Sequence, residues 1–534
     1  MSNDLWWQGA VFYQIYPRSF CDSNADGVGD LRGAIEKLDH ISACGFDAIW
    51  LSPFYASPMA DFGYDVTDYC AVDPMFGTLD DFDAFLKRAH ALGLKVIIDM
   101  VLAHTSKDHE WFKQSRTSRD NPKSDWYVWA DPKPDGTPPN NWMSIFGGVA
   151  WTFDTRRAQF YLHHFLKEQP QLNFHNPDVQ AEIFKICRFW LDRGVDGFRL
   201  DVINFLFHDP ALRNNPPKDP EKEGWSSQFT KPDPYSMQHH VYDKSRPEGL
   251  VFAEKFRQLM NEYPGTMTLA EIGDDHFIQC AADYTQGHAR YHTAYNFALM
   301  TGDEVTASMI RTAVETYEQS GGGWPSWSFC NHDVVRVVTR WGKKKGYDRQ
   351  PAFAKMLMAL LCSLKGTIFM YQGEELGLTE ATLTYDQLQD PWGKYLWPEW
   401  QGRDGCRTPL PWDDTQTHAG FSQVSGTTWL PGAPEHAVMS VNRQIKDTQS
   451  VYLFLKTFLA WRRAQPALIQ GDIRFIDTGD EEVVMFERGQ GDDRRVCLFN
   501  LSDQIKTYPR FSSMAPIFGT TGEELPAFGY QFWG

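Results

Sequence analysis

Four acidic residues of this chain each follow an apolar run at the point where the run ends. Asp99 lies near the end of VIIDMV, Asp201 follows GFRL, Glu271 ends TLAE and Asp333 comes just after SFCNH. In a barrel of parallel strands, catalytic groups stand at the carboxyl ends of the strands. A single carboxylate in such a place is usually a helix cap or a surface residue. Four in succession predict an acidic active site assembled from distant segments.

The surroundings of two of these carboxylates indicate their chemistry. Arg199 and Asp201 are two residues apart on one predicted strand, so their side chains share a face. A guanidinium beside a carboxylate lowers its pKa and keeps it ionised, as a nucleophile requires. Glu271 lies between Ala270 and Ile272, and shielding in such a context raises a carboxyl pKa, as a general acid requires. Two carboxylates in such opposed environments are typical of glycoside hydrolysis. The alternative for Arg199 and Asp201 is a purely structural ion pair. Spacing alone does not decide which carboxylate attacks.

The segment DSNADGVGD places oxygen donors at alternate positions. They are the side chains of Asp22, Asn24, Asp26 and Asp30 and the carbonyl of Val28. This spacing is similar to the first part of an EF-hand calcium loop, although Gly33 stands where that loop has its bidentate glutamate. The alternative is a polar turn after the first strand.

Short apolar runs that alternate with segments of helical period must position these residues. The predicted strands are Ala10–Tyr16, Phe46–Leu51, Leu94–Met100, Val195–Val202, Met267–Ile272, His292–Phe297, Trp327–Asn331 and Thr367–Tyr371. Helical segments between them include Ala34–Ala43, Leu79–Ala91 and Val179–Arg193. Such alternation predicts an α/β fold with a parallel sheet and helical crossovers. Eight runs match a (β/α)8 TIM barrel, and a doubly wound open sheet is the alternative that strand counting leaves open.

Two irregular stretches interrupt the barrel pattern. Residues 104–173, rich in Trp, Asn, Pro and Gly, predict an inserted subdomain after the third strand, and a second insertion covers about 374–443. After a helical segment, short runs at Ile473–Ile476, Val483–Arg488 and Arg495–Asn500 predict a C-terminal antiparallel β domain that is sandwich-like. The expected domains are therefore a barrel from 1–103 and 174–469, an insertion from 104–173 and a β domain from 470–534.

The composition narrows the choice of partner. The chain of 534 residues has a net charge of −18, and 15 % of its residues are aromatic, among them 20 Trp. An acidic protein gains nothing from nucleic-acid phosphates and is repelled by an anionic membrane surface, so neither a nucleic acid nor a membrane is expected as a partner. Aromatic faces are a usual platform for sugar rings, which favours a carbohydrate ligand.

The cysteines and the N-terminus indicate the compartment. The nine cysteines include no CxxC pair, which argues against a zinc ribbon or a dithiol redox site and favours free thiols in a reducing compartment. The N-terminus has no basic n-region, and no apolar run approaches the roughly 18 residues of a membrane span. The expected location is the cytoplasm, and no organic cofactor is expected.

Four segments in order are similar to the signature regions of the α-amylase superfamily, glycoside hydrolase family 13. They are DMVLAHTS (Asp99–Ser106), GFRLDVI (Gly197–Ile203), AEIG (Ala270–Gly273) and NHD (Asn331–Asp333). The opening WWQGAVFYQIYPRSF and the loop DSNADGVGDLRG resemble more narrowly its α-glucosidase and oligo-1,6-glucosidase branch. The resemblance runs from Trp6 to about Arg463 and continues more weakly beyond it.

The resemblance implies a role for each matching residue. It implies that Asp201 is the nucleophile, Glu271 the general acid/base and Asp333 the carboxylate that stabilises the transition state. The groups implied to bind substrate or to shape the site are Arg199 beside the nucleophile, Asp99, His104, His332, Asp61, Tyr64 and Arg407, the last as the partner of Asp61. It also implies a structural Ca²⁺ or Mg²⁺ on DSNADGVGD. A terminal glucose gripped in this way implies an exo-acting, retaining α-glucosidase for short oligosaccharides.

Residues beside the nucleophile bear on the linkage. In this branch Val at the position of Val202 accompanies α-1,6 cleavage, whereas Thr or Ala accompanies α-1,4 cleavage. QPQLN (Gln169–Asn173) resembles the α-1,6-type QPDLN, but it departs at Gln171, and Leu200 replaces a frequent Met. The resemblance implies an α-1,6-capable enzyme with some α-1,4 and transglycosylation activity. The alternative is an α-glucosidase that prefers α-1,4 linkages or sucrose, or a glucosyl-transferring enzyme.

Two rival functions fit less well. A sucrose isomerase is disfavoured because an RLDRD-like signature is absent. A non-catalytic glucosidase-like transporter subunit is disfavoured because the catalytic residues are kept and no membrane span is seen.

Overall fold

A barrel of parallel strands forms the centre of the computed structural model, which describes residues 5–224, 233–295, 297–508 and 514–534. In chain order the barrel strands are β1 (Val11–Ile15), β2 (Ala48–Leu51), β5 (Lys95–Val101), β9 (Gly197–Asp201), β10 (Met267–Glu271), β11 (Thr293–Tyr295), β12 (Ser326–Trp327) and β13 (Thr367–Tyr371).

The hydrogen-bonded order of these strands closes the barrel. Among the described residues, eight parallel strands form one sheet in the order β11-β10-β9-β5-β2-β1-β13-β12, and its end strands β11 and β12 contact each other. The predicted TIM barrel is confirmed, and the open-sheet alternative is wrong. Each predicted strand overlaps one observed strand, although β5 runs one residue past its predicted end and β12 shares only Trp327 with the predicted run Trp327–Asn331. Of the segment His292–Phe297, Asn296 lies outside the described residues.

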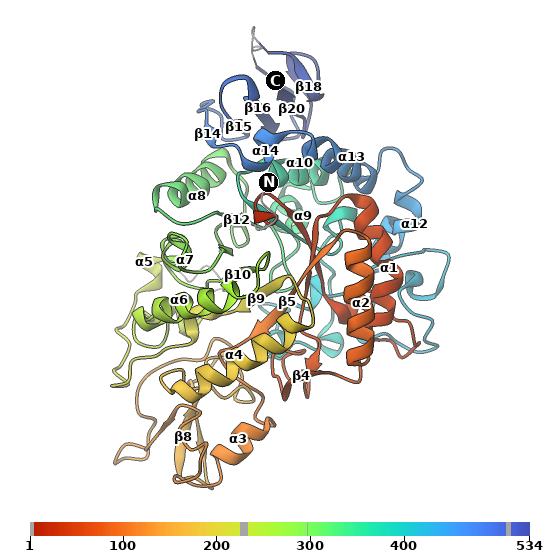
Figure 1. Cartoon of the computed structure of the whole chain (residues 1–534). Coiled ribbons are helices and arrows are strands. Elements are labelled where there is room, and N and C mark those ends of the chain that lie inside the picture. Colours follow the sequence, from red (N-terminus) through yellow and green to blue (C-terminus); the bar gives the residue numbers. More distant parts are fainter. Residues whose placement is uncertain (1–4, 225–232, 296, 509–513) are drawn as a thin grey trace.

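Helices cover the outside of the barrel. The longer ones are α1 (Leu31–Cys44), α2 (Leu79–Ala91), α4 (Pro177–Asp192), α6 (Pro247–Asn261), α7 (Phe277–Thr285), α8 (Ala307–Gln319), α10 (Pro351–Ser363) and α13 (Val451–Arg463). Shorter ones are α5 (Pro220–Glu223), α9 (Val337–Gly342), α11 (Pro391–Leu396), α12 (Val441–Gln444) and α14 (Pro466–Gln470). Figure 1 shows α1 and α2 on one side of the strands and α6, α7 and α8 on the other.

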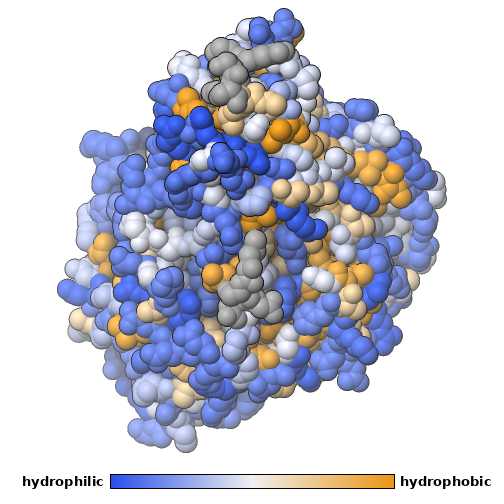
Figure 2. Space-filling model, turned by 45° about the horizontal axis from the view of Figure 1, so that its top comes forward, coloured by the Kyte–Doolittle hydropathy of each residue, from blue (hydrophilic) through white to orange (hydrophobic). Residues whose placement is uncertain are grey.

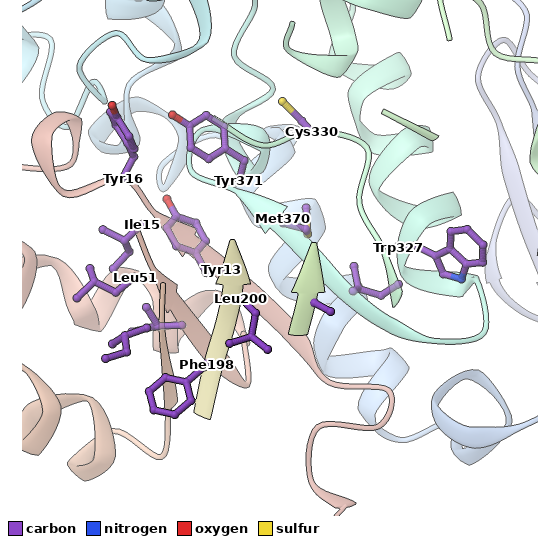
Figure 3. Close-up of a cluster of buried hydrophobic side chains, with 14 of the residues drawn as sticks. Tyr13, Ile15, Tyr16, Leu51, Phe198, Leu200, Trp327, Cys330, Met370 and Tyr371 are labelled. Carbon is purple, nitrogen blue, oxygen red and sulfur yellow. The ribbon is translucent and has the colours of Figure 1, made fainter. Parts of the chain in front are cut away.

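Alternation along the strands separates two apolar layers. Tyr13, Leu51 and Phe198 belong to a large cluster that also contains helix residues, so they face outward, and Figure 3 shows part of this layer. Phe12 and Trp50, one position away on the same strands, belong to a second cluster inside the barrel. Because the period of a strand is two, each barrel strand packs against helices on one face and presents the other face to the interior.

Two further units lie at opposite ends of the view in Figure 1. The segment 104–173 carries α3 (Glu110–Ser115) and a sheet in the order β6-β8-β7, whose strands are Trp129–Ala130, Gln159–Leu162 and Trp151–Asp154. An antiparallel pair, β3 (Tyr55–Ala56) and β4 (Asp68–Val72), precedes it along the chain.

The C-terminal unit is an antiparallel sheet, as predicted. Its order is β14-β15-β16-β20-β18, with strands Ile473–Phe475, Val483–Arg488, Arg495–Asn500, Tyr530–Trp533 and Pro516–Gly519. Between β16 and β20 along the chain, β17 (Lys506–Thr507) and β19 (Glu524–Leu525) form a separate short antiparallel pair.

The outer surface agrees with the polar composition. The face drawn in Figure 2 is mostly hydrophilic, and its hydrophobic residues lie in small, separate patches. Within the described residues, no helix is both long and apolar enough to cross a lipid bilayer.

Candidate active site

The ends of three neighbouring strands bring the predicted acidic residues together. Asp99 lies on β5, while Asp201 ends β9 and Glu271 ends β10. The register of the sheet places Asp99 opposite Arg199 and Glu271 opposite Tyr295 of β11. Residues two apart on a strand share a face, so Arg199 and Asp201 both point into the barrel. The predicted convergence is therefore confirmed for these side chains.

A glycine allows this close register between β9 and β10. Gly197, the first residue of β9, has φ +147°, and a Cβ there would lie 2.0 Å from the carbonyl oxygen of Met267. A larger residue would push β9 away from β10. The glycine of the GFRLD segment is thus needed to hold the two carboxylate-bearing strands side by side.

The guanidinium of Arg199 connects the carboxylates. It is fully buried, and its Nη1 donates to Asp99 Oδ1 at 2.7 Å and to Asp201 Oδ1 at 2.6 Å. Its Nη2 contacts Glu271 Oε2 and donates to the Tyr295 hydroxyl at 2.8 Å. A planar guanidinium offers several donors in fixed directions, so one cation orients three acids at once.

The third predicted carboxylate approaches from the loop after β12. Asp333 Oδ1 accepts hydrogen bonds from Arg407 Nη2 at 2.8 Å and Arg403 Nη1 at 3.3 Å. Burial acts against its charge, but the guanidinium groups of Arg403 and Arg407 hold the pKa of Asp333 below its usual range. Asp333 is therefore ionised at any working pH.

The arginine that pairs with Asp61 is Arg403 and not Arg407, so the predicted pairing is wrong. Arg403 Nη2 lies 2.8 Å from Asp61 Oδ1, and Gln169 Nε2 donates to the other oxygen at 3.1 Å. Both arginines belong to the segment GRDGCRTP. The turn between them directs Arg403 toward Asp61, whereas Arg407 is directed toward Asp333.

These groups surround one pocket. The predicted residues that line it are Asp61, Tyr64, His104, Asp201, Val202, Glu271 and Asp333. Asp99, Arg199, His332 and Arg407 are buried behind this lining. Much of the remaining wall is aromatic and is formed by Phe146, Phe165, Phe205, Phe297 and Trp392.

Comparison with known proteins places this site in a family. Residues 14–471 match the family described as alpha amylase, catalytic domain. The chain belongs to the α-amylase family. It is 51 % identical over 504 residues to a probable alpha-glucosidase of Rhizobium meliloti (strain 1021), covering 94 % of this chain and 90 % of that protein. It is also 36 % identical over 541 residues to an oligo-1,6-glucosidase of Heyndrickxia coagulans, covering 94 % and 93 %.

A solved structure agrees with these relatives. The alpha-glucosyl transfer enzyme XgtA superposes with a TM-score of 0.95 at 51 % identity and covers 99 % of each chain. The predicted superfamily and its α-glucosidase branch are confirmed, and the chain is a glycoside hydrolase of the α-glucosidase type. A non-catalytic subunit is therefore excluded.

The electrostatics of this glycoside hydrolase differ from the prediction at Asp201. Burial raises the pKa of Asp201 well above its usual value, although Arg199 lowers it; Glu271 and Asp99 raise it further. Burial likewise raises the pKa of Asp99 to about 6 against the pull of Arg199. The expected net lowering at Asp201 is wrong, because one guanidinium is shared among several buried carboxylates.

The two predicted histidines occupy different depths. His104 faces the pocket, and its Nε2 lies 2.9 Å from the Tyr64 carbonyl and 3.1 Å from Gln169 Nε2. His332 stacks on the Tyr64 ring, and its Nε2 is 2.6 Å from the Tyr64 hydroxyl. Burial lowers the pKa of His104 to about 4 and lowers that of His332 as well, so both rings are neutral at neutral pH.

Val202, which directly follows the predicted nucleophile Asp201, has a strained backbone conformation. It has φ 38° and ψ 45°, a left-handed geometry that β-branched residues rarely adopt. Its backbone amide lies 3.2 Å from Glu271 Oε2, and its side chain lines the pocket. The strain turns the end of β9 so that a backbone donor faces the carboxylate of β10.

The loop predicted to hold a divalent cation is a turn tied by its own side chains. Asp22 accepts hydrogen bonds from the Gly27 amide at 2.8 Å and from the Ser422 hydroxyl. Asp30 is the N-cap of α1 and accepts from the Gly33 amide at 2.7 Å. A Cβ at Gly33 would lie 2.1 Å from the Cys21 carbonyl oxygen, which explains the glycine at that position.

Two further predicted metal ligands of this loop lie at the surface. Asn24 and Asp26 are exposed, and each accepts one backbone amide of the turn. Across the described parts of the chain, no three His, Cys, Asp or Glu side chains form a metal-holding group. An all-oxygen donor set with free lone pairs suits Ca²⁺ or Mg²⁺ chemically. The cation itself stays a prediction.

Sequence reasoning missed Gln169, Arg403 and Tyr295. Gln169 bridges Asp61 and His104 and is the first residue of QPQLN, while Arg403 shares its motif with Arg407. Tyr295 lies on a predicted strand, but its place beside Glu271 follows only from the register of β11 with β10.

Proposed function

We propose that the protein is a retaining, exo-acting α-glucosidase that removes terminal glucose from short oligosaccharides by double displacement. The observation that carries this proposal is the contact of Asp201 and Glu271 with one guanidinium beneath one pocket. Two carboxylates that contact one guanidinium lie close together, which favours the retaining arrangement, in which the two carboxyl groups are about 5–5.5 Å apart. Inverting enzymes need about 6.5–9.5 Å to admit a water.

The proposed mechanism gives each carboxylate one task. Asp201 attacks the anomeric carbon while Glu271 donates a proton to the departing glycosidic oxygen, which leaves a glucosyl ester on Asp201. Glu271 then removes a proton from a water or a sugar hydroxyl that displaces the ester. Asp333, which stays ionised, stabilises the positive charge that develops on the sugar ring.

The pair formed by Asp61 and Arg403 supports exo action. Both side chains are buried, both line the pocket, and their ion pair at 2.8 Å faces the space where a terminal sugar would bind. Paired charges with fixed geometry suit the hydroxyls of a single terminal glucose. The preferred linkage is proposed to be α-1,6 with some α-1,4 activity, supported by Val202 in the pocket wall and by the oligo-1,6-glucosidase relative.

Glucosyl transfer is proposed as a second reaction of the same site. The wall contributed by Phe146, Phe165, Phe205 and Trp392 is apolar and disfavours ordered water, so a sugar hydroxyl competes well for the glucosyl ester. The similarity to a glucosyl transfer enzyme supports the same reaction.

The nucleophile assignment is tested by the Asp201→Asn variant. Asparagine keeps the oxygen that accepts from Arg199, so the fold should persist, while turnover should fall roughly 10⁴-fold or more. Circular dichroism checks the fold, and turnover of 4-nitrophenyl α-glucoside checks the rate. Near-normal activity in the folded variant would refute the assignment.

Product analysis tests the stereochemistry and the linkage. Proton NMR of reactions with isomaltose, maltose and sucrose gives the anomer formed first, the relative rates and any transfer products. We expect α-glucose first, with isomaltose turned over well. A first product of β-glucose would overturn retention, and a strong preference for maltose would overturn the α-1,6 assignment.

We further propose a structural Ca²⁺ or Mg²⁺ on the loop Asp22–Asp30, supported by its alternate oxygen donors. Asp26→Asn keeps the oxygen that caps the Val28 amide but removes one charge. The wild type should gain thermal stability with Ca²⁺ or Mg²⁺ and lose it in excess chelator, and the variant should respond less. A wild-type melting temperature that changes with neither the divalent cation nor the chelator would contradict the proposed cation site.

A cytoplasmic location is proposed as well. All nine cysteines lie in the described part of the chain, and each is a free thiol. Free, largely buried thiols are typical of reducing compartments, which supports this location.

A further inference from the structure

Tyr295 lies between Arg199, which contacts the proposed nucleophile, and Glu271, the proposed acid/base. Its hydroxyl accepts a hydrogen bond from Arg199 Nη2 at 2.8 Å and donates one to Glu271 Oε1 at 2.8 Å. The register of β10 and β11 sets Tyr295 directly opposite Glu271. The contact is therefore built into the barrel and does not depend on a loop.

The direction of this hydrogen-bond chain is fixed by chemistry. A guanidinium has donors and no acceptor, so the Tyr295 oxygen must accept from Arg199. The hydroxyl hydrogen is then left for Glu271 Oε1. Burial raises the pKa of Tyr295 well above its usual value, so the hydroxyl keeps that hydrogen at any working pH.

Tyr295 acts from behind the pocket and not from its wall. Its side chain is 2 % exposed and packs in the barrel interior against Trp50 and Phe297. Phe297 and Glu271 line the pocket in front of it. A substrate in the pocket would therefore meet Glu271 without touching Tyr295.

We propose that Tyr295 is a positioning residue that orients Glu271 and tunes its proton affinity through a hydrogen bond of fixed direction. This inference rests on the proposed function, in which Glu271 is the acid/base. A donor to a carboxylate stabilises its ionised form. Tyr295 thus eases proton release to the leaving group and holds the carboxylate in place for the second half of the reaction.

Other charged groups lie near Glu271 and Tyr295 and also act on the acid/base. They come from the adjoining strands and from the loop after β12, and they are Asp99, Arg199, Asp201 and Asp333. Arg199 reaches Asp201 through Nη1 and reaches Tyr295 and Glu271 through Nη2. Loss of the tyrosine hydroxyl therefore removes a donor from Glu271 and leaves the contact to Asp201 in place.

The Tyr295→Phe variant should move the basic limb of the pH profile of kcat/KM and leave the acid limb in place. Loss of the donor disfavours the carboxylate form of the acid/base, so the basic limb of kcat/KM should move about one pH unit higher, the size of one hydrogen bond to a charged group. The acid limb should stay in place. For maltose, kcat should fall roughly tenfold because its leaving group needs a proton, and less for 4-nitrophenyl α-glucoside. KM should change by less than about twofold, because Tyr295 does not touch substrate.

Tyr291→Phe is the matched control. Tyr291 is also buried, four residues earlier, and its hydroxyl has no hydrogen-bond partner among the described residues. Melting temperatures and full pH profiles are recorded for both variants with both substrates. The control should leave both limbs and the kcat ratio of the two substrates unchanged.

The outcomes separate the inference from the function on which it rests. A basic limb that moves in Tyr295→Phe alone supports the positioning role. Superimposable profiles, or a lower kcat with both limbs and the substrate ratio unmoved, would overturn it and leave a packing role. Full activity of Glu271→Gln toward maltose would instead overturn the assignment of the acid/base itself.

Discussion

Single residues determine the pH at which this site can work. As the proposed nucleophile, Asp201 must be ionised to attack, and its pKa is raised by burial, so activity should be lost as pH falls through that raised value. We expect the acid limb of kcat/KM to lie clearly above the ordinary aspartate value of about 3.9. Asp99→Asn should move the limb to lower pH, because it removes a negative charge that raises the pKa of Asp201. A wild-type limb near the ordinary value would contradict the burial of the nucleophile.

The pairing of Asp61 with Arg403 can be tested against the pairing first expected from the motif. Arg403→Lys loses the hydrogen bond from Nη2 to Asp61 and should lower kcat/KM by roughly 10–100-fold, the size of a hydrogen bond between charged groups. In an Asp61→Ala background the same substitution should cost much less.

Arg407→Lys provides the comparison, because Arg407 contacts Asp333. Its effect should remain nearly the same with or without Asp61. If the double-mutant cycles show equal coupling of Arg403 and Arg407 to Asp61, the assignment of Arg403 as the partner of Asp61 is wrong.

Helices and strands were the part of this molecule that sequence patterns predicted well. Short apolar runs mark the barrel strands, and three of the four acids that follow such runs, Asp99, Asp201 and Glu271, meet at adjacent strand ends. Parallel strands share one edge for their carboxyl ends, so this convergence follows from local signals alone. The domain boundaries after 103, 173 and 469 stay predictions.

Contacts between elements could not be predicted in the same way. Arg403 and Arg407 are four residues apart in one motif, and a 3-10 turn over Asp404–Cys406 decides which guanidinium meets Asp61. The pKa of Asp201 depends on burial by the whole barrel, whereas the sequence displays only its neighbour Arg199. Local spacing shows which groups can pair, and packing decides which of them do.

The whole molecule carries a buried acid whose charge matters for stability. Glu374, just after β13, is 4 % exposed, and burial raises its pKa to about 8 although the Tyr371 amide donates to it at 2.6 Å. Between about 4.3, its unfolded value, and pH 8, the native protein holds a proton that the unfolded chain has lost. Stability from this group therefore falls as pH rises across that window.

Glu374→Gln should remove this dependence. Glutamine keeps an oxygen for the Tyr371 amide but has no proton to lose, so the drop in melting temperature from pH 5 to pH 8.5 should be smaller than in the wild type. Glu487→Gln is the control: despite burial, Arg474 and Arg494 hold the pKa of Glu487 below its usual value. That substitution removes stabilisation already complete at pH 5, so it should lower the melting temperature by a similar amount throughout. Parallel curves for the wild type and Glu374→Gln would show that Glu374 is ionised in the native protein at pH 5, which its burial makes unfavourable.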